Sequence, residues 1–423
     1  MRNEGRITAG PGGFVVLAAD RVENSGLLAA ERGEVLLASG SALTLSLDAE
    51  GLVAYSIDAA ALSGRAGVEN LGEIVANGGS VMLDAEVAHS LIGKVVNNQG
   101  RITAQSIEEH DGAIYLMAEG GDIENSGTLD ASGAGQADGG RVILRGDRDL
   151  SLTDTGVIAA AGAGSGDGGL IRVIAEGQAD TAAGSVISAT AGPAGRLGGF
   201  VELSGHGGLR VRGQVDVGRH GRLLIDPTVV NIANGNGTSG SAAGTATVFE
   251  QFIETQLRRG ADVAIVASDR IRLDTLTDGL LDGRNAGAGG NLLLGIGSVF
   301  GSSNGLFVDG PPPAGFGFNP GPGDSSAGGI FFQSLGNAIR VDGQLELAGG
   351  TARGQISVGN LEGSRVGVEV NNGTLSVGSI LANGGFSSAG DIDIEAKGTG
   401  TITHLGAMRL RSAGFIDVFA AQG

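Results

Sequence analysis

The sequence predicts an all-β chain wound into a parallel β-helix, and three observations lead to this fold class. Glycine contributes 81 of the 423 residues, whereas proline contributes 8 and cysteine and tryptophan are absent. Hydrophobic residues make up 41% of the chain but aromatic residues only 4%, so the core must be built from Val, Ile, Leu and Ala. Two short units recur along the chain, as expected of a repeat architecture.

The first unit has the pattern Asn/Asp-x-Gly-x-Ile/Leu-x-Ala. From Asn70 onward it returns after 28, 27 and 29 residues. The second unit, Gly-Gly-x-Val-x-Leu, follows copies of the first, with Ile or Val at some of its apolar positions. The first unit begins at Asn3, Asn24, Asn70, Asn98, Asn125 and Asp154, and the second at Gly12, Gly78, Gly139, Gly168 and Gly198.

Each unit predicts one short strand, because apolar residues alternate with polar or small ones over four to six positions. The Asn-x-Gly and Gly-Gly pairs are expected to supply the positive φ of tight corners. Stacked copies bury the apolar faces that one strand leaves exposed, which predicts roughly 14–19 turns of ~22–29 residues. A disordered glycine-rich repeat and an antiparallel β-sandwich are the less favoured alternatives.

Regular repeats are predicted over 1–226, an irregular loop and a short helix over 227–262, and continued β-helix over 263–423. The helix is expected at 247–259, packed on the side of the solenoid near 248–259. Thr247 and Glu250 suggest a capping box, and Gly260 suggests a C-cap. A docking site for a partner helix is the alternative role. The apolar stripe of this helix consists of Phe249, Phe252, Ile253 and Leu257.

Two protruding loops are predicted at 231–246 and 302–328 because both are rich in Gly, Asn, Ser or Pro. The chain begins inside a repeat and ends at Gly423 with an uncapped turn. Because solenoid ends normally carry caps, we expect a fragment of a longer protein or a reading frame that was started at the wrong place.

Composition argues against several functions. The net charge is −19 and the pI is near 4.6, which disfavours binding to nucleic acid and to anionic lipid. The lack of cysteine excludes disulfides, thiolate metal sites and a thiol nucleophile. The chain has no run of about 18 apolar residues, so no membrane span is predicted. The N-terminus has no signal-peptide pattern.

Candidate chemistry is sparse. Arg145-Gly146-Asp147 follows the strand 142–144 and is a possible receptor-binding tripeptide of low specificity. The glycine pattern of 164–169 precedes a strand instead of a helix, so it does not predict a dinucleotide site. Asp138 and Asp167 suit corner turns better than calcium-binding turns, although calcium dependence stays open.

No catalytic, cofactor-binding or metal-ligating residues are predicted. The acidic pairs Glu108-Glu109 and Asp391-x-Asp393 are read as solvated side chains that keep the β-helix soluble. Ser204-Gly-His206 lacks the other elements of a catalytic triad. The five histidines have no metal-ligand spacing: His89, His110, His206, His220 and His404.

Three features resemble the filamentous haemagglutinin-like exoproteins of two-partner secretion, in the stretch after their amino-terminal secretion domain. They are the repeats at 22–26 and 33–40, the phrase Leu-Leu-Ile-Asp-Pro-Thr at 223–228, and the helix at 247–259 followed by a Val-Ala-Ile-Val strand. The resemblance covers most of 1–300 and, more loosely, the rest. The secretion domain, the signal peptide and a toxin-like C-terminal domain are not seen in this sequence.

The resemblance implies a right-handed β-helix, export through an outer-membrane transporter, and an extracellular location at the cell surface. The predicted function is a non-enzymatic adhesive segment of a large secreted fibre that binds a receptor or glycan on a host or neighbouring cell. The alternatives are a β-helix polysaccharide lyase or hydrolase, and a passive stalk that carries a toxin.

Overall fold

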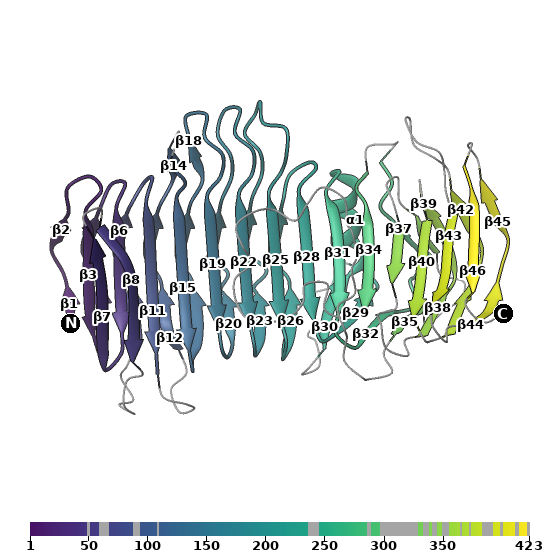
Figure 1. The fold of residues 1–423 in the computed structure, drawn as a ribbon, viewed down its shortest axis with the longest axis horizontal. Helices are drawn as coiled ribbons and strands as arrows, with labels where there is room; N and C mark the ends of the chain where they lie inside the picture. The colour runs from purple at the N-terminus through teal and green to yellow at the C-terminus, as the bar shows by residue number, and fades with distance from the viewer. Residues whose placement is uncertain are drawn as a thin grey trace. The chain divides into compact units, whose positions relative to one another are not determined.

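A computed structural model describes the chain as two units, Met1–Gly221 and Arg222–Gly423, shown in Figure 1. Every described strand pairs in parallel, except β7 and β8, which pair with each other in an antiparallel hairpin. The predicted parallel β-helix is therefore confirmed. The structure describes all residues except 49–50, 59–66, 88–93, 108–109, 236–244, 286–288, 297–328, 333–337, 341–344, 349–354, 364–365, 372–373, 383–391, 398–400, 411–413 and 421–423.

The first unit has three parallel sheets, which we name A, B and C. Sheet A contains β1 (Arg2–Asn3), β4 (Arg21–Asn24), β9 (Gly67–Asn70), β12 (Lys94–Asn98), β16 (Asp122–Asn125), β20 (Leu150–Leu152), β23 (Gln178–Thr181) and β26 (Gly208–Val211). Sheet B contains β2 (Arg6–Thr8), β5 (Leu27–Ala29), β10 (Glu73–Val75), β13 (Arg101–Thr103), β17 (Thr128–Asp130), β21 (Val157–Ala159), β24 (Val186–Ser188) and β27 (Gln214–Asp216). Sheet C contains β3 (Phe14–Ala19), β6 (Glu34–Ser39), β11 (Ser80–Glu86), β15 (Ala113–Glu119), β19 (Arg141–Gly146), β22 (Leu170–Ala175) and β25 (Phe200–Gly205).

Two further strand pairs belong to the first unit. The hairpin joins β7 (Ala42–Asp48) and β8 (Gly51–Asp58), which the repeat pattern did not predict. A short parallel pair joins β14 (Ser106–Ile107) and β18 (Gly133–Ala134) at the bases of two loops.

The second unit also has three parallel sheets, named D, E and F. Sheet D contains β30 (Ala246–Phe249), β29 (Val229–Ala233), β32 (Arg270–Leu273), β35 (Gly329–Phe332), β38 (Gln355–Val358), β41 (Thr374–Val377) and β44 (Thr401–Leu405). Sheet E contains β33 (Leu280–Asp282), β36 (Ala338–Arg340), β39 (Asn360–Gly363), β42 (Ile380–Ala382) and β45 (Met408–Leu410). Sheet F contains β28 (Arg222–Pro227), β31 (Asp262–Ala267), β34 (Leu292–Ile296), β37 (Leu345–Ala348), β40 (Val366–Asn371), β43 (Ile392–Lys397) and β46 (Ile416–Ala420).

The core of the first unit consists of columns of aliphatic side chains. In sheet B, residue pairs in register place one apolar residue of each turn directly above the next, and most of the column is fully buried. Val142 and Leu144 of sheet C are equally buried, so burial of stacked aliphatic side chains supplies the main favourable term. The sheet B column runs through Ile7, Leu28, Ile74, Ile102, Leu129, Ile158, Ile187 and Val215.

The glycine of the Asn-x-Gly units after the first turn is required for a reason that differs from the predicted one. Its φ is not positive. A Cβ at Gly26, Gly72, Gly100 or Gly127 would instead lie 2.0–2.2 Å from a carbonyl oxygen of the previous turn. Close approach of stacked backbones therefore selects glycine there, whereas a positive φ does so at Gly12 and Gly78.

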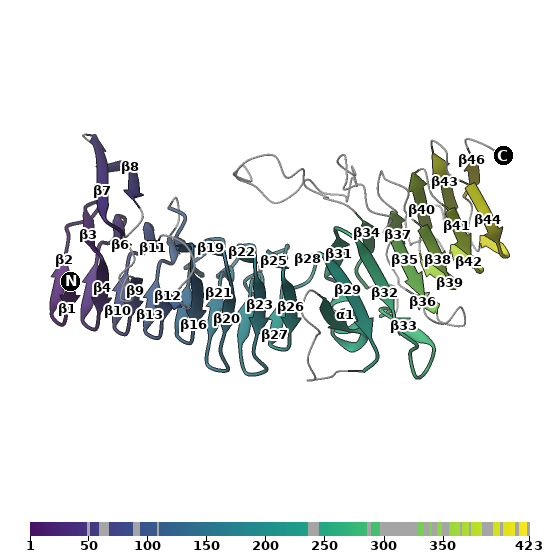
Figure 2. The same ribbon diagram turned by 90° about the horizontal axis from the view of Figure 1, so that it is seen from below.

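The single helix among the described residues, α1 (Glu250–Arg258), packs against β30, β31 and β33 of the second unit (Figure 2). The C-cap is Arg259, and the predicted Gly260 follows it with φ +82° and ends the helix, its N–H donating to the Leu257 carbonyl. The predicted capping box is wrong, because Thr247 lies in β30 and Phe249 is the N-cap.

Two strands, β29 and β30, lie within 227–262, where the sequence predicts only a loop and a helix. A short apolar strand between loop residues was too weak a pattern to separate from them. The predicted loop 302–328 and most of 231–246 lie outside the described residues, as do Glu108, Glu109 and Asp391.

Candidate interaction surface

The tripeptide Arg145-Gly146-Asp147 lies at the end of β19 on sheet C. Strand alternation turns the buried Gly146 inward and leaves Arg145 exposed. Asp147 is also exposed; its N–H donates to the Ala118 carbonyl at 3.0 Å, and its Oδ2 accepts from the Gly120 N–H at 3.2 Å. The backbone is thus tied to the preceding turn, and the receptor role of the tripeptide stays a prediction.

Asp147 belongs to a row of acidic residues on consecutive turns. Glu86 and Glu119 pair in register, and Asp147 and Glu176 follow directly after the paired residues Gly146 and Ala175. We name Glu86, Glu119, Asp147 and Glu176 the acidic corner row. Burial raises the pKa of Glu86, and the Glu119 and Asp58 carboxylates raise it further.

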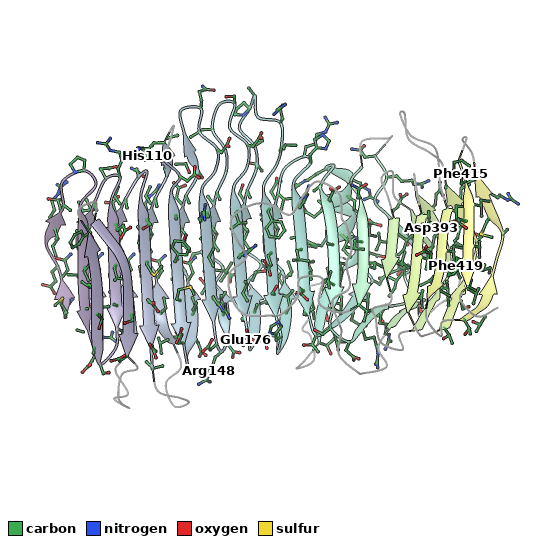
Figure 3. All side chains as sticks on the ribbon, in the orientation of Figure 1. His110, Arg148, Glu176, Asp393, Phe415 and Phe419 are labelled. Atoms are coloured by element: carbon green, nitrogen blue, oxygen red, sulfur yellow. The ribbon has the colours of Figure 1, made fainter. Side chains whose placement is uncertain are left out.

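The acidic corner row ends at a histidine. His206 follows β25 as Glu176 follows β22, and its Nδ1 lies 2.6 Å from Glu176 Oε2. Figure 3 shows Glu176 and Arg148 at the lower edge of the strands in that view. Stacked carboxylates at the turn spacing of about 4.8 Å present a line of negative charge, which is suited to a basic partner.

A second charged cluster lies further along sheet C and is buried. Ile143, Arg172 and Glu202 occupy one column on its outward side. Arg172 Nε lies 3.2 Å from Glu202 Oε2, and the Ser204 hydroxyl donates to Glu202 Oε1 at 3.1 Å. Burial raises the pKa of Glu202, although Arg172 and Ser204 oppose the shift.

This cluster is a buried ion pair in which Arg172 Nε makes the salt bridge to Glu202. The Arg172 guanidinium also lies 5.9 Å from the centroid of the Phe200 ring, which is cation–π distance. Glycoside hydrolysis needs two carboxyl groups that flank the scissile bond, and this cluster contains only one. The signal for it was present in the sequence, because Arg172 and Glu202 occupy the same position of successive second units.

Three glycine-rich loops, 131–139, 160–168 and 189–198, rise beyond the strands between β17 and β25 (Figure 1). They are stacked by hydrogen bonds from one loop to the next, such as Gly133 N to Ala161 O at 2.7 Å and Gly162 N to Thr190 O at 2.8 Å. The formal glycine pattern of 164–169 lies largely in the middle loop and precedes β22, as the sequence indicates.

The two corner aspartates use their carboxylates to join these loops. Asp138 Oδ1 accepts from the Asp167 N–H at 2.7 Å. Asp167 Oδ1 in turn accepts from the N–H groups of Arg196 and Leu197 at 2.8 and 2.9 Å. Hydrogen bonds from the Leu197 and Arg196 backbone hold the pKa of Asp167 below its ordinary value, against the effect of burial. In the described part of the chain, no group of three potential ligands could hold a metal ion.

The comparisons with known proteins give no family. No protein-family model matches the chain, and no curated protein is similar to it by sequence. Among the residues that the structure describes, no helix has the length and apolar character needed to cross a membrane.

Proposed function

We propose that this chain is a non-enzymatic structural and adhesive segment of a large secreted surface fibre. The observation that carries the proposal is the regular stacking of parallel strands in sheets A, B and C, where, among the described strand pairs, the register shifts only between Lys94 and Val96 of β12. This register repeats outward side chains in straight rows at a fixed spacing, as in the acidic corner row. Such rows allow many weak contacts with a partner surface to add through multivalency.

The proposed contact surface combines the acidic corner row, the exposed Arg145 and the three stacked loops. All of them lie in the first unit, where hydrogen bonds between turns hold the backbone of the strands and loops that carry them. A preorganised surface loses less conformational entropy on binding. The proposed partner is a receptor or glycan on a host or neighbouring cell, and export through an outer-membrane transporter remains part of the proposal.

Fractionation of the native cells tests the fibre. An antibody to this chain is expected to detect, in surface or culture-supernatant fractions, a product far larger than the 41.8 kDa of the chain. A product of about that mass inside the cell would contradict the proposed secretion.

Binding to cells tests adhesion. The purified chain is expected to bind intact cells in a saturable way that weakens with salt, since charged rows mediate contact. Arg145→Ala should reduce binding if the tripeptide takes part, whereas Arg148→Ala, which removes a nearby arginine outside the tripeptide, is the matched control. A chain that binds no cell or glycan would favour the passive stalk, and release of reducing ends from a polysaccharide would favour the enzyme.

A further inference from the structure

Asn234 and Gly235 lie directly after β29, beside the first residue of α1. The Gly235 N–H donates to Glu250 Oε1 at 2.8 Å. The side-chain carbonyl Oδ1 of Asn234 accepts from the Thr277 N–H at 2.6 Å. Two neighbouring groups of one Asn-Gly pair are therefore held by a carboxylate and by a backbone donor.

Glu250 holds the Gly235 N–H with only one of its two carboxylate oxygens. Its side chain is buried, with 7% of the residue exposed. Its second oxygen, Oε2, is buried and has no hydrogen-bond partner in the described part of the chain. A buried carboxylate with an unused oxygen is poorly solvated, so it gains from taking up a proton.

These contacts supply two of the groups that an intramolecular cyclisation needs. The reaction needs a base for the backbone N–H that follows the asparagine, and a donor for the oxyanion that forms on the side-chain carbonyl. Gly235 has φ +88°, and among the described residues other than its chain neighbours no heavy atom lies within 4 Å of where a Cβ would be. The nucleophilic nitrogen thus carries no side chain that would hinder attack.

We propose that Asn234-Gly235 is a self-modification site at which Glu250 acts as a general base in succinimide formation and deamidation. Glu250 removes the proton from Gly235 N, which attacks Asn234 Cγ while the Thr277 N–H stabilises the oxyanion on Oδ1. The Cγ–Nδ2 bond breaks, and Nδ2 leaves as ammonia with the proton from Glu250. Water then opens the succinimide to aspartate or isoaspartate, and the carboxylate of Glu250 is restored.

The electrostatic surroundings strengthen the base. Burial raises the pKa of Glu250, and the nearby Asp278 and Glu254 carboxylates raise it further, whereas the Gly235 N–H lowers it. Glu254 is itself engaged by the Asp282 N–H at 2.7 Å and by Arg258 at 3.1 Å. A carboxylate with a pKa closer to neutral is a better proton acceptor at neutral pH.

The first unit contains a matched internal control, Asn77-Gly78. Asn77 Oδ1 also accepts from a backbone donor, the Gln105 N–H at 3.1 Å. The Gly78 N–H, however, donates to the Gln105 carbonyl at 2.7 Å, and a neutral carbonyl cannot accept the proton. The two sites share a dipeptide and a backbone donor on Oδ1, and they differ in the acceptor of the glycine N–H and in exposure, since Gly78 is buried. The Glu250→Gln variant therefore isolates the contribution of the base.

The experiment incubates the folded full chain in heavy-oxygen water at neutral pH. After trypsin digestion, fragmentation of the peptide 223–258 locates the label at 234 and separates it from the neighbouring Asn236. The conversion rate at Asn234 should exceed that at Asn77 by about 10²-fold, and Glu250→Gln should bring it down to the rate at Asn77. Circular dichroism checks that the variant folds.

Unfolding the wild-type chain in urea provides a test that does not depend on the variant. The two sites should then react at similar rates, because neither retains its partners. The proposal is overturned if folded Asn234 reacts no faster than Asn77, if its advantage persists in urea, or if the folded Glu250→Gln chain reacts as fast as the wild type.

Discussion

The first and last turns of sheet A fill the same interior column with different chemistry. From β1 to β16 the column consists of five buried asparagines, Asn3, Asn24, Asn70, Asn98 and Asn125, and each Nδ2 donates to Oδ1 of the next at 2.7–2.9 Å. From β20 onward it consists of Leu152, Thr181 and Val211. The same column position of sheet A therefore holds either an amide ladder or a column of Leu, Thr and Val, in which the Thr181 hydroxyl hydrogen-bonds to backbone groups.

The asparagine ladder and the Leu–Thr–Val column differ in what the loss of one side chain leaves behind. Each interior amide of the ladder satisfies both neighbours and also lies 3.2–3.4 Å from the carbonyl of the glycine two residues later. Removal of one amide leaves polar groups on two turns unsatisfied, whereas removal of one aliphatic chain leaves a local cavity. The two regions are therefore expected to respond differently to the loss of one side chain.

The largest loss of stability is expected when a charged side chain is placed in the buried aliphatic core. Leu144→Asp places a charge in a fully buried aliphatic column and should cost more than about 4 kcal/mol. Thermal unfolding and hydrogen exchange should show loss of the adjacent turns. Ile143→Asp, on the outward side of the same strand, is the control and should be tolerated; unfolding of Leu144→Asp at the parent temperature would disprove the stacked core.

Breaking the ladder should have the second largest effect. Asn98→Leu leaves the amides of Asn70 and Asn125 without their partner, so we expect a loss of about 2–4 kcal/mol. The measurement is backbone hydrogen exchange on β9 and β16.

The reverse substitution tests the same point from the apolar side. Leu152→Asn places an amide next to Asn125, which offers it a donor, whereas Ile158→Asn places one in the aliphatic column of sheet B. Leu152→Asn should therefore destabilise less than Ile158→Asn. Equal losses would mean that the ladder does not recognise an added amide.

How far the sequence predicts this structure depends on whether a feature is local. Strand alternation and the end of the helix at Gly260 depend on neighbouring residues, and both were predicted correctly. The amide ladder depends on contact between residues 21 to 46 positions apart, so the repeated Asn was read as a corner residue. The hairpin β7–β8 interrupts the repeat, which is why its pairing was missed.

In the candidate interaction surface, too, local features could be predicted from the sequence and contacts between turns could not. The exposed tripeptide at Arg145 could be found as a motif, but the acidic corner row appears only when the turns are placed in register. Arg172 and Glu202 occupy matching repeat positions in the sequence. Only the register of β22 and β25 shows that the two side chains lie side by side. Loop lengths of the individual turns set this register, and they vary along the chain.

A fourth prediction compares the glycines of the two regions. A Cβ at Gly100, in the ladder region, would lie 2.0 Å from the Gly72 carbonyl oxygen, whereas one at Gly156 would lie 2.6 Å from the Asn125 carbonyl oxygen. Gly100→Ala should cost about 1–3 kcal/mol and Gly156→Ala less. Gly10→Ala is the control, since no atom lies within 4 Å of its Cβ position. Thermal midpoints in the opposite order would contradict a role for close stacking.

The smallest expected effect is a change of local stability with pH. It should occur in the loops that Asp167 joins and be absent from the neutral amide ladder. The fold lowers the pKa of Asp167, so the stability from this group is present above its unfolded pKa and is lost as pH falls through the folded one. Acid should therefore speed hydrogen exchange at the Arg196 and Leu197 amides, beyond its intrinsic effect, and leave β9 and β12 unchanged. Asp167→Asn keeps an acceptor oxygen but carries no charge that acid could remove. Exchange at the Arg196 and Leu197 amides should therefore no longer respond to acid, and the variant should be less stable by about 1 kcal/mol. An equal acid response in the variant would show that another group titrates there.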